Sequence, residues 1–254
     1  MIGPIELDER SRSTPLGRAS PLAKLAVAVV WLGGLALTVD PRPPALLAAL
    51  ALASGLLLGR IPVGTLVGRL APLGLAALVV GISNALVSPA NADPAQFEVG
   101  RLGSLRLTLP AAQAGLSLGL RVVAIASLGT VFALTTDATR LTDALVQVAR
   151  LPERFAYGAL AAYQAVPGLS RDLTTLQQAR RIRGLRQSWH PEVLLALLVL
   201  AVRHADRQAV AMDARAFGLG PRTRYRVERW RRQDTVLILI SVLVLAAALA
   251  TSRL

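Results

Sequence analysis

Long runs of apolar residues limit the folds that this chain can adopt. Five of them, rich in Leu, Ala and Val, lie at about residues 22–39, 44–59, 66–87, 110–134 and 235–251. A helix needs roughly 20 apolar residues to cross about 30 Å of hydrocarbon, and it satisfies its own backbone groups there. The sequence therefore predicts an all-α integral membrane protein with about five transmembrane helices, of which 44–59 is short for a full span.

A basic block separates the fourth apolar run from the fifth. Residues 135–232 hold 17 arginines and 8 acidic residues, and so carry most of the chain's net charge of +13. Cytoplasmic loops of membrane proteins are enriched in Arg and Lys. We therefore expect a plasma-membrane protein whose N-terminal arm (1–21) and basic block are cytoplasmic. Membrane helices 1–4 would lie at 22–134, and a C-terminal membrane helix at 233–254.

Helical patterns run through the basic block. Residues 171–186 are polar and helical, and Gly184 is a suitable stop for that helix. A second helix opens at Pro191, and small or apolar residues recur along it at spacings of three and four, at Val202, Ala205, Ala209, Met212 and Ala216. The apolar segment 155–169 has only 15 residues, and we expect it to lie against the membrane bundle. The block thus predicts long amphipathic cytoplasmic helices.

Between the third and fourth apolar runs, residues 88–110 read as a loop with Pro, Asn, Asp and Gly. Within it, residues 97–99 and 105–108 alternate between apolar and polar side chains. Such alternation is typical of extended backbone. We expect two short extended pieces there.

Two short motifs in the basic block resemble each other. Ile182-Arg183-Gly184 and Ala214-Arg215-Ala216 each place an arginine near a helix C-terminus, with small residues around it. Small neighbours let a partner's backbone approach, and arginine presents a fork of donors that pairs a carboxylate bidentately. Two such ends would suit two equivalent grooves on a partner. A solvated basic face with glycine stops would give the same pattern.

Arg121 lies ten residues into the fourth apolar run, which places it near mid-membrane. A charged side chain at that depth costs about 2.5–3.5 kcal/mol on insertion scales. Arg121 should therefore face other helices or water. An intramembrane functional role and a structural hydrogen bond explain it equally well.

The sequence lacks the motifs of catalytic and cofactor-binding proteins. It contains no G-x-x-x-x-G-K-[ST] phosphate loop for ATP and no cysteine, which excludes thiolate metal sites. His190 and His204 are 14 residues apart with no carboxylate at metal-ligand spacing, so we expect them at a surface or an interface. We predict no enzyme activity, no cofactor and no metal site.

At the two arginine motifs the chain resembles the transmembrane T component of energy-coupling factor (ECF) transporters, the CbiQ/EcfT-type family. That family has two Ala-Arg-Gly-like motifs, from which this chain departs at Ile182 and at Ala216. Four further segments are similar to the family: Pro21-Leu22-Ala23-Lys24-Leu25, with Ser20 in place of an Asp, Thr135-Thr136, Leu141–Leu145 and Leu151–Arg154. The resemblance therefore covers most of the chain.

The resemblance implies a non-catalytic coupling subunit of an ABC-class importer for a vitamin or a transition-metal ion. Its partners would be two ABC-type ATPase subunits, a small membrane-embedded substrate-binding S component and the lipid bilayer. Arg183 and Arg215, with the neighbours in their motifs, would each bind one ATPase groove. The stripe from Val202 to Ala216 would pack against the other coupling helix or the S component. ATP-driven closure of the ATPases would move these helices and release substrate inward.

Two other hypotheses follow from the residues alone. A self-sufficient channel or carrier would use Arg121 to line its path, but paired inverted repeats, which many carriers show, are not evident. A binder of nucleic acid or anionic lipid would use the arginines of 222–232. An arginine run beside a membrane span more often fixes orientation and contacts headgroups. We therefore expect no nucleic-acid partner.

Overall fold

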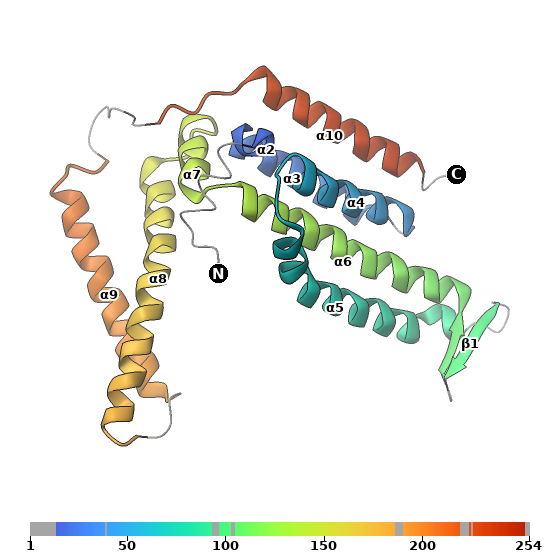
Figure 1. Cartoon of the computed structure of the whole chain (residues 1–254), viewed down its shortest axis with the longest axis horizontal. Coiled ribbons are helices and arrows are strands. Elements are labelled where there is room, and N and C mark those ends of the chain that lie inside the picture. The colour runs from blue at the N-terminus through green and yellow to red at the C-terminus, as the bar shows by residue number, and fades with distance from the viewer. Residues whose placement is uncertain are drawn as a thin grey trace. The chain divides into compact units, whose positions relative to one another are not determined.

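The computed structural model describes residues 14–38, 40–92, 97–102, 105–185, 190–218, 224 and 226–251 (Figure 1). They belong to two compact units. Unit 1 combines Met1–Leu141 with Arg229–Leu254, and unit 2 is Thr142–Glu228. The first 13 residues of the expected N-terminal arm and Arg222 of the arginine run lie outside the described residues.

The apolar helices of unit 1 fall into a longer and a shorter group. Three are long and apolar enough to cross a membrane: α5 (Val63–Val87), which the short helix η1 (Pro89–Ala92) follows, α6 (Leu109–Thr135) and α10 (Arg232–Ala250). Two are also apolar but have 16 residues, namely α3 (Pro21–Ala36) and α4 (Arg42–Leu57). All five apolar runs are thus helical, and the predicted all-α membrane fold is confirmed. The first two runs form helices of only about 24 Å.

Prolines mark where the first two, shorter helices begin. Proline is tolerated in the first turn of a helix but not in its interior. Pro21 therefore begins α3, and Pro43 and Pro44 occupy the first turn of α4. A four-residue helix, α2 (Pro15–Arg18), precedes α3 and is capped by the Thr14 side chain.

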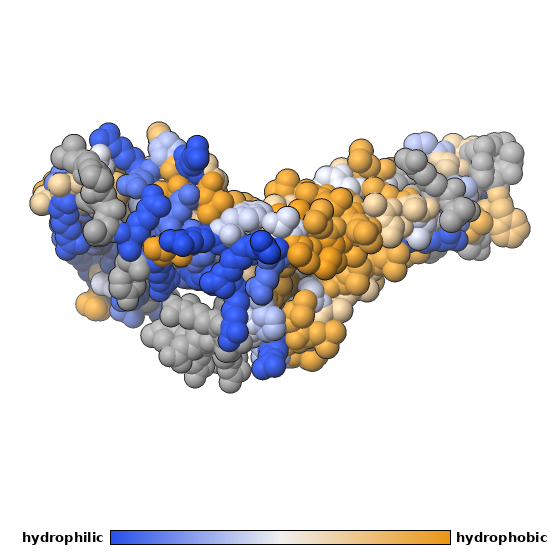
Figure 2. Space-filling model, turned by 90° about the horizontal axis from the view of Figure 1, so that it is seen from above, coloured by the Kyte–Doolittle hydropathy of each residue, from blue (hydrophilic) through white to orange (hydrophobic). Residues whose placement is uncertain are grey.

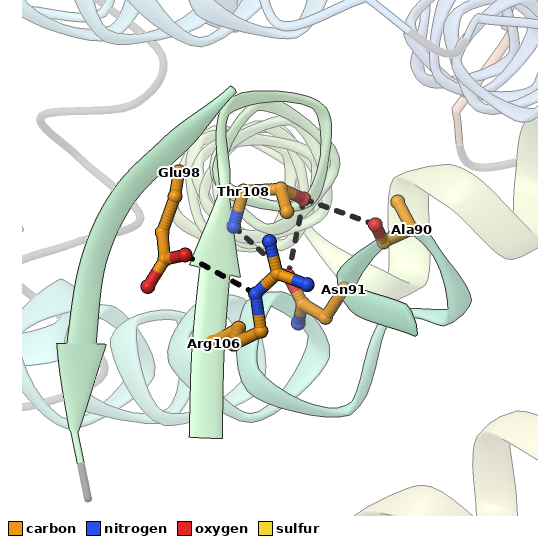
Figure 3. A network of polar contacts seen from close by, with 5 residues as sticks. All are labelled: Ala90, Asn91, Glu98, Arg106 and Thr108. Carbon is orange, nitrogen blue, oxygen red and sulfur yellow. Dashed lines mark hydrogen bonds and ion pairs between the residues drawn. The ribbon is translucent and has the colours of Figure 1, made fainter. Parts of the chain in front are cut away.

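A small hairpin lies between the C-terminal end of α5 and the N-terminal end of α6. Its strands, β1 (Glu98–Leu102) and β2 (Leu105–Thr108), pair antiparallel, which confirms the two predicted extended pieces. Asn91 joins the hairpin to α5, and Figure 3 shows its contact with Thr108. Its Oδ1 accepts from the backbone N of Thr108 at 3.0 Å, and its Nδ2 donates to the carbonyl of Ala85 at 2.7 Å. An Arg106–Glu98 ion pair of 3.2 Å links the two strands.

Close packing of small residues holds α5 against α6. Gly81 and Ala85 of α5 face Gly115 of α6. A Cβ added at Gly115 would lie 2.5 Å from the Gly81 carbonyl oxygen and 2.6 Å from the Ala85 Cβ. Small residues at such spacings are a common way for membrane helices to approach one another.

Helices α3, α4, α6 and α10 of unit 1 share an apolar core. Its buried members come from α3, α4, α6 and α10, and are Trp31, Leu35, Leu47, Ala48, Ala51, Ala124 and Leu245. The indole Nε1 of Trp31 donates to the carbonyl of Ser241 at 3.3 Å. Many large apolar side chains of α5 and α10 face outward, among them Leu75 and Leu243, and apolar surface covers the unit 1 helices in Figure 2. This exposed apolar surface is what a lipid environment requires.

Unit 2 contains two long helices, α8 (Glu153–Ile182) and α9 (Pro191–Asp213), and receives the second half of α7 (Ala138–Gln147). The two segments expected at 155–169 and 171–186 join into the single helix α8, which continues through Pro167. The Ser170 hydroxyl and the Arg171 guanidinium both donate to the Pro167 carbonyl. That the segment 155–169 lies against the membrane bundle stays a prediction.

Candidate functional site

The motif Ile182-Arg183-Gly184 forms a complete helix end. The N–H of Gly184 donates to the Arg181 carbonyl at 3.0 Å, and the N–H of Leu185 donates to the Arg180 carbonyl at 3.1 Å. Gly184 has a φ of +77°. These two bonds and the left-handed residue define a Schellman motif, in which Arg183 is the capping residue. The predicted glycine stop is confirmed.

The motif Ala214-Arg215-Ala216 has the same backbone pattern. The N–H of Ala216 donates to the Asp213 carbonyl at 2.9 Å, and the N–H of Phe217 donates to the Met212 carbonyl at 3.0 Å. Ala216 is left-handed, with a φ of +55°. Arg215 therefore occupies the position that Arg183 has in the first motif. The likeness of the two sequences reflects one shared conformation.

Helices α8 and α9 form an antiparallel pair (Figure 1). Arg183 and Arg215 follow their C-terminal ends and therefore lie at opposite ends of the pair. The antiparallel arrangement follows from two contacts between α8 and α9: the Arg180–Glu192 ion pair at 2.8 Å, and the His204 imidazole 3.6 Å from the Asp172 carboxylate. Because α9 has 23 residues, the motifs are separated by roughly 35 Å along the pair. Both arginines are exposed, and Ile182 beside Arg183 is 88% exposed.

The first tip is held together by charges around Glu192. Its carboxylate accepts from Arg180 at the end of α8, and the neighbouring His190 caps the start of α9 by accepting from the Glu192 backbone N. Hydrogen bonding from Arg180, followed by the charge of His190, lowers the pKa of Glu192. These contacts fix the turn that presents Arg183. The His190 and His204 imidazoles lie 3.5 Å from Glu192 and 3.6 Å from Asp172, and their side chains are 37% and 49% exposed, as expected of surface or interfacial residues.

The second tip rests on the start of α8. The ring of Phe217 packs edge-on to that of Tyr157, with centroids 6.4 Å apart. The Tyr157 hydroxyl donates to Asp143 of α7 at 2.8 Å. Burial, and then the bond to Asp143, raises the pKa of Tyr157 to about 12. Gly218 fits against Arg154, whose Nε would lie 2.7 Å from an added Cβ.

A groove of about 640 Å³ lies between α8 and α9. Small side chains form most of its lining, which comprises Gly158, Ala161, Ala162, Ala165, Gly168, Leu169, Ala201, His204, Ala205, Gln208, Ala209 and Met212. Three members of the predicted stripe, Ala205, Ala209 and Met212, are in it. Val202 is not, and its side chain is 55% exposed.

Arg121 makes a structural hydrogen bond within unit 1. Its Nη2 donates to the backbone carbonyl of Thr38, just after the end of α3. Its Nε is buried and has no hydrogen-bond partner among the described residues. This bond is the structural hydrogen bond that the sequence allowed as one of two roles for Arg121. An intramembrane functional role stays a prediction.

In the described part of the chain, no group of three or more His, Asp or Glu residues could hold a metal ion. The features that distinguish unit 2 are therefore its two exposed arginine ends and the groove between its helices.

A family model described as cobalt transport protein, CbiQ, matches residues 12–225. The chain belongs to the CbiQ family. This confirms the resemblance that the arginine motifs indicated. The matched range contains both motifs and both long helices of unit 2.

Three curated relatives of this CbiQ-family chain carry the same protein name. The energy-coupling factor transporter transmembrane protein EcfT of Listeria innocua is 31% identical over 165 residues, which is 58% of this chain and 62% of the relative. Those of Streptococcus equi and Bacillus subtilis are 28% and 30% identical, over 57% and 53% of this chain and 60% and 57% of the relatives. The chain thus spans about three-fifths of the length of the curated relatives it matches.

Sequence reasoning missed the shared conformation of the two arginines in this CbiQ-family chain. Gly184 marks the left-handed position in the first motif. In the second motif Ala216 takes that position, and alanine carries no such signal. An alignment of the two motifs by their arginines would have placed Ala216 opposite Gly184.

Proposed function

We propose that this CbiQ-family chain is the transmembrane coupling subunit of an ECF-type importer. It transmits ATP-driven movement of two ABC-type ATPase subunits to a membrane-embedded S component that carries a vitamin or a transition-metal ion. The chain itself is non-catalytic and lies in the plasma membrane, with its N-terminus and residues 135–232 cytoplasmic. The observation that carries this proposal is the pair of exposed arginines in one conformation at the two ends of α8 and α9.

Each arginine end suits a rigid contact with an acidic groove. The Schellman bonds satisfy the last carbonyls of the helix, so the tip keeps its shape without a partner. Arg183 and Arg215 lie beside those carbonyl ends and can pair a carboxylate bidentately. Two equivalent ends about 35 Å apart match two copies or homologues of one partner better than a single site.

Movement of the two ATPases would pass into the membrane part through α8 and α9. If each ATPase holds one end of the helix pair, closure of the ATPases changes the angle between the helices. The small-residue groove between them, which includes Ala205 and Ala209, would then change shape. A helix of the S component packed on small residues would follow that change, because such contacts are close.

The experiment compares Arg183→Ala, Arg215→Ala and the double variant with Arg203→Ala, an exposed arginine in the middle of α9. Removing one partner of a desolvated charge pair costs about 2–5 kcal/mol. We expect each single variant to weaken co-purification of the ATPases at least about tenfold, and the double variant to abolish it, while membrane insertion persists. Arg203→Ala should bind normally. Normal assembly and uptake by the double variant would contradict the proposal.

A further inference from the structure

Unit 1 has a buried polar cluster at the point where the chain enters and leaves unit 2. The chain passes into unit 2 after Leu141 and returns at Arg229. Close to both crossings lie four polar residues that are 2–7% exposed: Ser20, Lys24, Thr135 and Asp234. Lysine and aspartate are almost never fully buried unless they are paired. Their partners show what the cluster does.

Asp234 caps two helices with one carboxylate. Its Oδ1 accepts from the backbone N of Ser20 at 2.9 Å, and its Oδ2 accepts from the backbone N of Arg231 at 2.9 Å. Ser20 directly precedes α3, and Arg231 directly precedes α10. A negative charge at a helix N-terminus is stabilising, and here it serves two helix starts. The carboxylate thereby fixes the returning chain to the start of α3.

Lys24 binds the segment that leaves α6 toward unit 2, and it does so near the start of α3. One turn into α3, its Nζ donates to the carbonyl of Thr135 at 2.6 Å and to the hydroxyl of Thr136 at 3.4 Å. Thr135 is the last residue of α6, where a positive charge complements the helix dipole. Five residues further on, Arg140 donates to the carbonyl of Gly17 at 2.7 Å.

Both connections are therefore tied to the eight residues 17–24. We propose that this segment and Asp234 form an anchor, and that Lys24 and Asp234 are positioning residues through which movement of unit 2 reaches the membrane helices. The inference rests on the proposed coupling function. A movement is transmitted only where the connecting chain cannot turn freely, and the anchor prevents both connections from turning.

The test uses the full transporter complex and three variants. Ser20→Pro removes the donor N–H and the serine hydroxyl, which caps no N–H of α3, and the φ of Ser20 (−58°) and the extended backbone of Ala19 suit a proline at this position. Asp234→Asn keeps the volume and removes the charge. Lys24→Met keeps a long unbranched side chain and removes the charged donor. Glu98→Gln, which changes an acid of the distant hairpin, is the control.

We expect each variant to bind the ATPases normally but to transport at least fivefold less substrate per ATP hydrolysed. Trypsin should also cleave faster after Arg140. The control should match the wild type. An unchanged ratio, with uptake and hydrolysis falling together or not at all, would overturn the inference. If Asp234→Asn or Lys24→Met does not accumulate, Ser20→Pro decides, since it removes the N–H that Asp234 accepts from and leaves both charged residues in place.

The failure of the proposed function would look different. Wild-type protein would then not bind the ATPases at all, whereas the faster cleavage after Arg140 in the variants would persist. Wild-type coupling together with normal coupling in all three variants would leave the function intact and refute the anchor.

Discussion

At the scale of single residues, Arg183 and Arg215 have equivalent positions, but the residues after them differ. Gly184 adopts its left-handed conformation without strain, whereas Ala216 needs the same conformation and carries a Cβ. For an L-residue this costs about 1–2 kcal/mol. The second tip is therefore the less stable one, and its contacts, such as Phe217 on Tyr157, have to compensate for the strain.

Ala216→Gly should stabilise unit 2 by up to about 1 kcal/mol, because it relieves this strain. The matched control is Ala214→Gly, two residues earlier, where the backbone is right-handed helical with a φ of −60°. There the same substitution should destabilise the protein by about 0.5–1 kcal/mol. Thermal unfolding of the purified variants measures both effects. Shifts of the same sign would show that Ala216 is not strained.

At the scale of elements, the sequence predicted helices better than it predicted where they end and which residues they contact. All five apolar runs are helical, because composition alone decides that in a membrane. The join of 155–169 to 171–186 was not foreseen, since the change from apolar to polar residues does not interrupt α8. The contacts of Lys24 with Thr135 and of Asp234 with Ser20 join residues 111 and 214 positions apart. No local pattern reveals such pairs.

The seam between α5 and α6 should be intolerant of any side chain at Gly115. Gly115→Ala places a methyl group 2.5 Å from a backbone oxygen, and overpacking of this kind costs about 1–3 kcal/mol. Gly129→Ala on the same helix meets nothing within 4 Å and should be neutral or slightly stabilising. Thermal stability in mild detergent compares the two variants. Equal stability would mean that the seam is looser than the structure shows.

The stability of the contact between α7 and α8 should depend on Tyr157. Tyr157→Phe leaves the buried carboxylate of Asp143 without this donor, at a cost of about 1–3 kcal/mol. The raised pKa of Tyr157, about 12 in the folded chain against 10.0 ordinarily, has a second consequence. The folded state holds the phenol proton more tightly, so this stabilisation is complete below pH 10 and is lost as the pH rises toward 12.

Alkaline titration of tyrosinate absorbance tests that prediction. The chain has three tyrosines, and Tyr157→Phe should remove the component that titrates highest. A high-pH component that persists in the variant would assign it to another tyrosine.

At the scale of the whole molecule, the chain divides into an apolar unit and a charged one. The division follows from the sequence, where the basic block at 135–232 interrupts the apolar runs, and the structure sets the unit boundaries at 141/142 and 228/229. The family was also readable from the sequence, because its motifs are spread over most of the chain. Orientation in the membrane rests on the charge of the block.

Labelling of single cysteines tests this orientation, since the chain has no cysteine of its own. Glu98→Cys in the hairpin should react with a membrane-impermeant maleimide on intact cells. Thr174→Cys in α8 should react only after the cells are opened. Both side chains belong to exposed residues, so access to solvent does not limit either reaction. The reverse pattern would invert the proposed topology.

Two contacts fix how far α3 extends along α6. Lys24 meets Thr135 and Thr38, just after α3, meets Arg121, so the 14 positions from Lys24 to Thr38 run beside 14 positions of α6. The first 12 residues of α6, about 18 Å, continue beyond the end of α3. A bilayer around this protein therefore meets longer and shorter helices. Its hydrocarbon core has to thin by about 6 Å beside the shorter helices. At fractions of a kcal/mol per Å, this elastic strain amounts to a few kcal/mol and would favour any neighbour that relieves it.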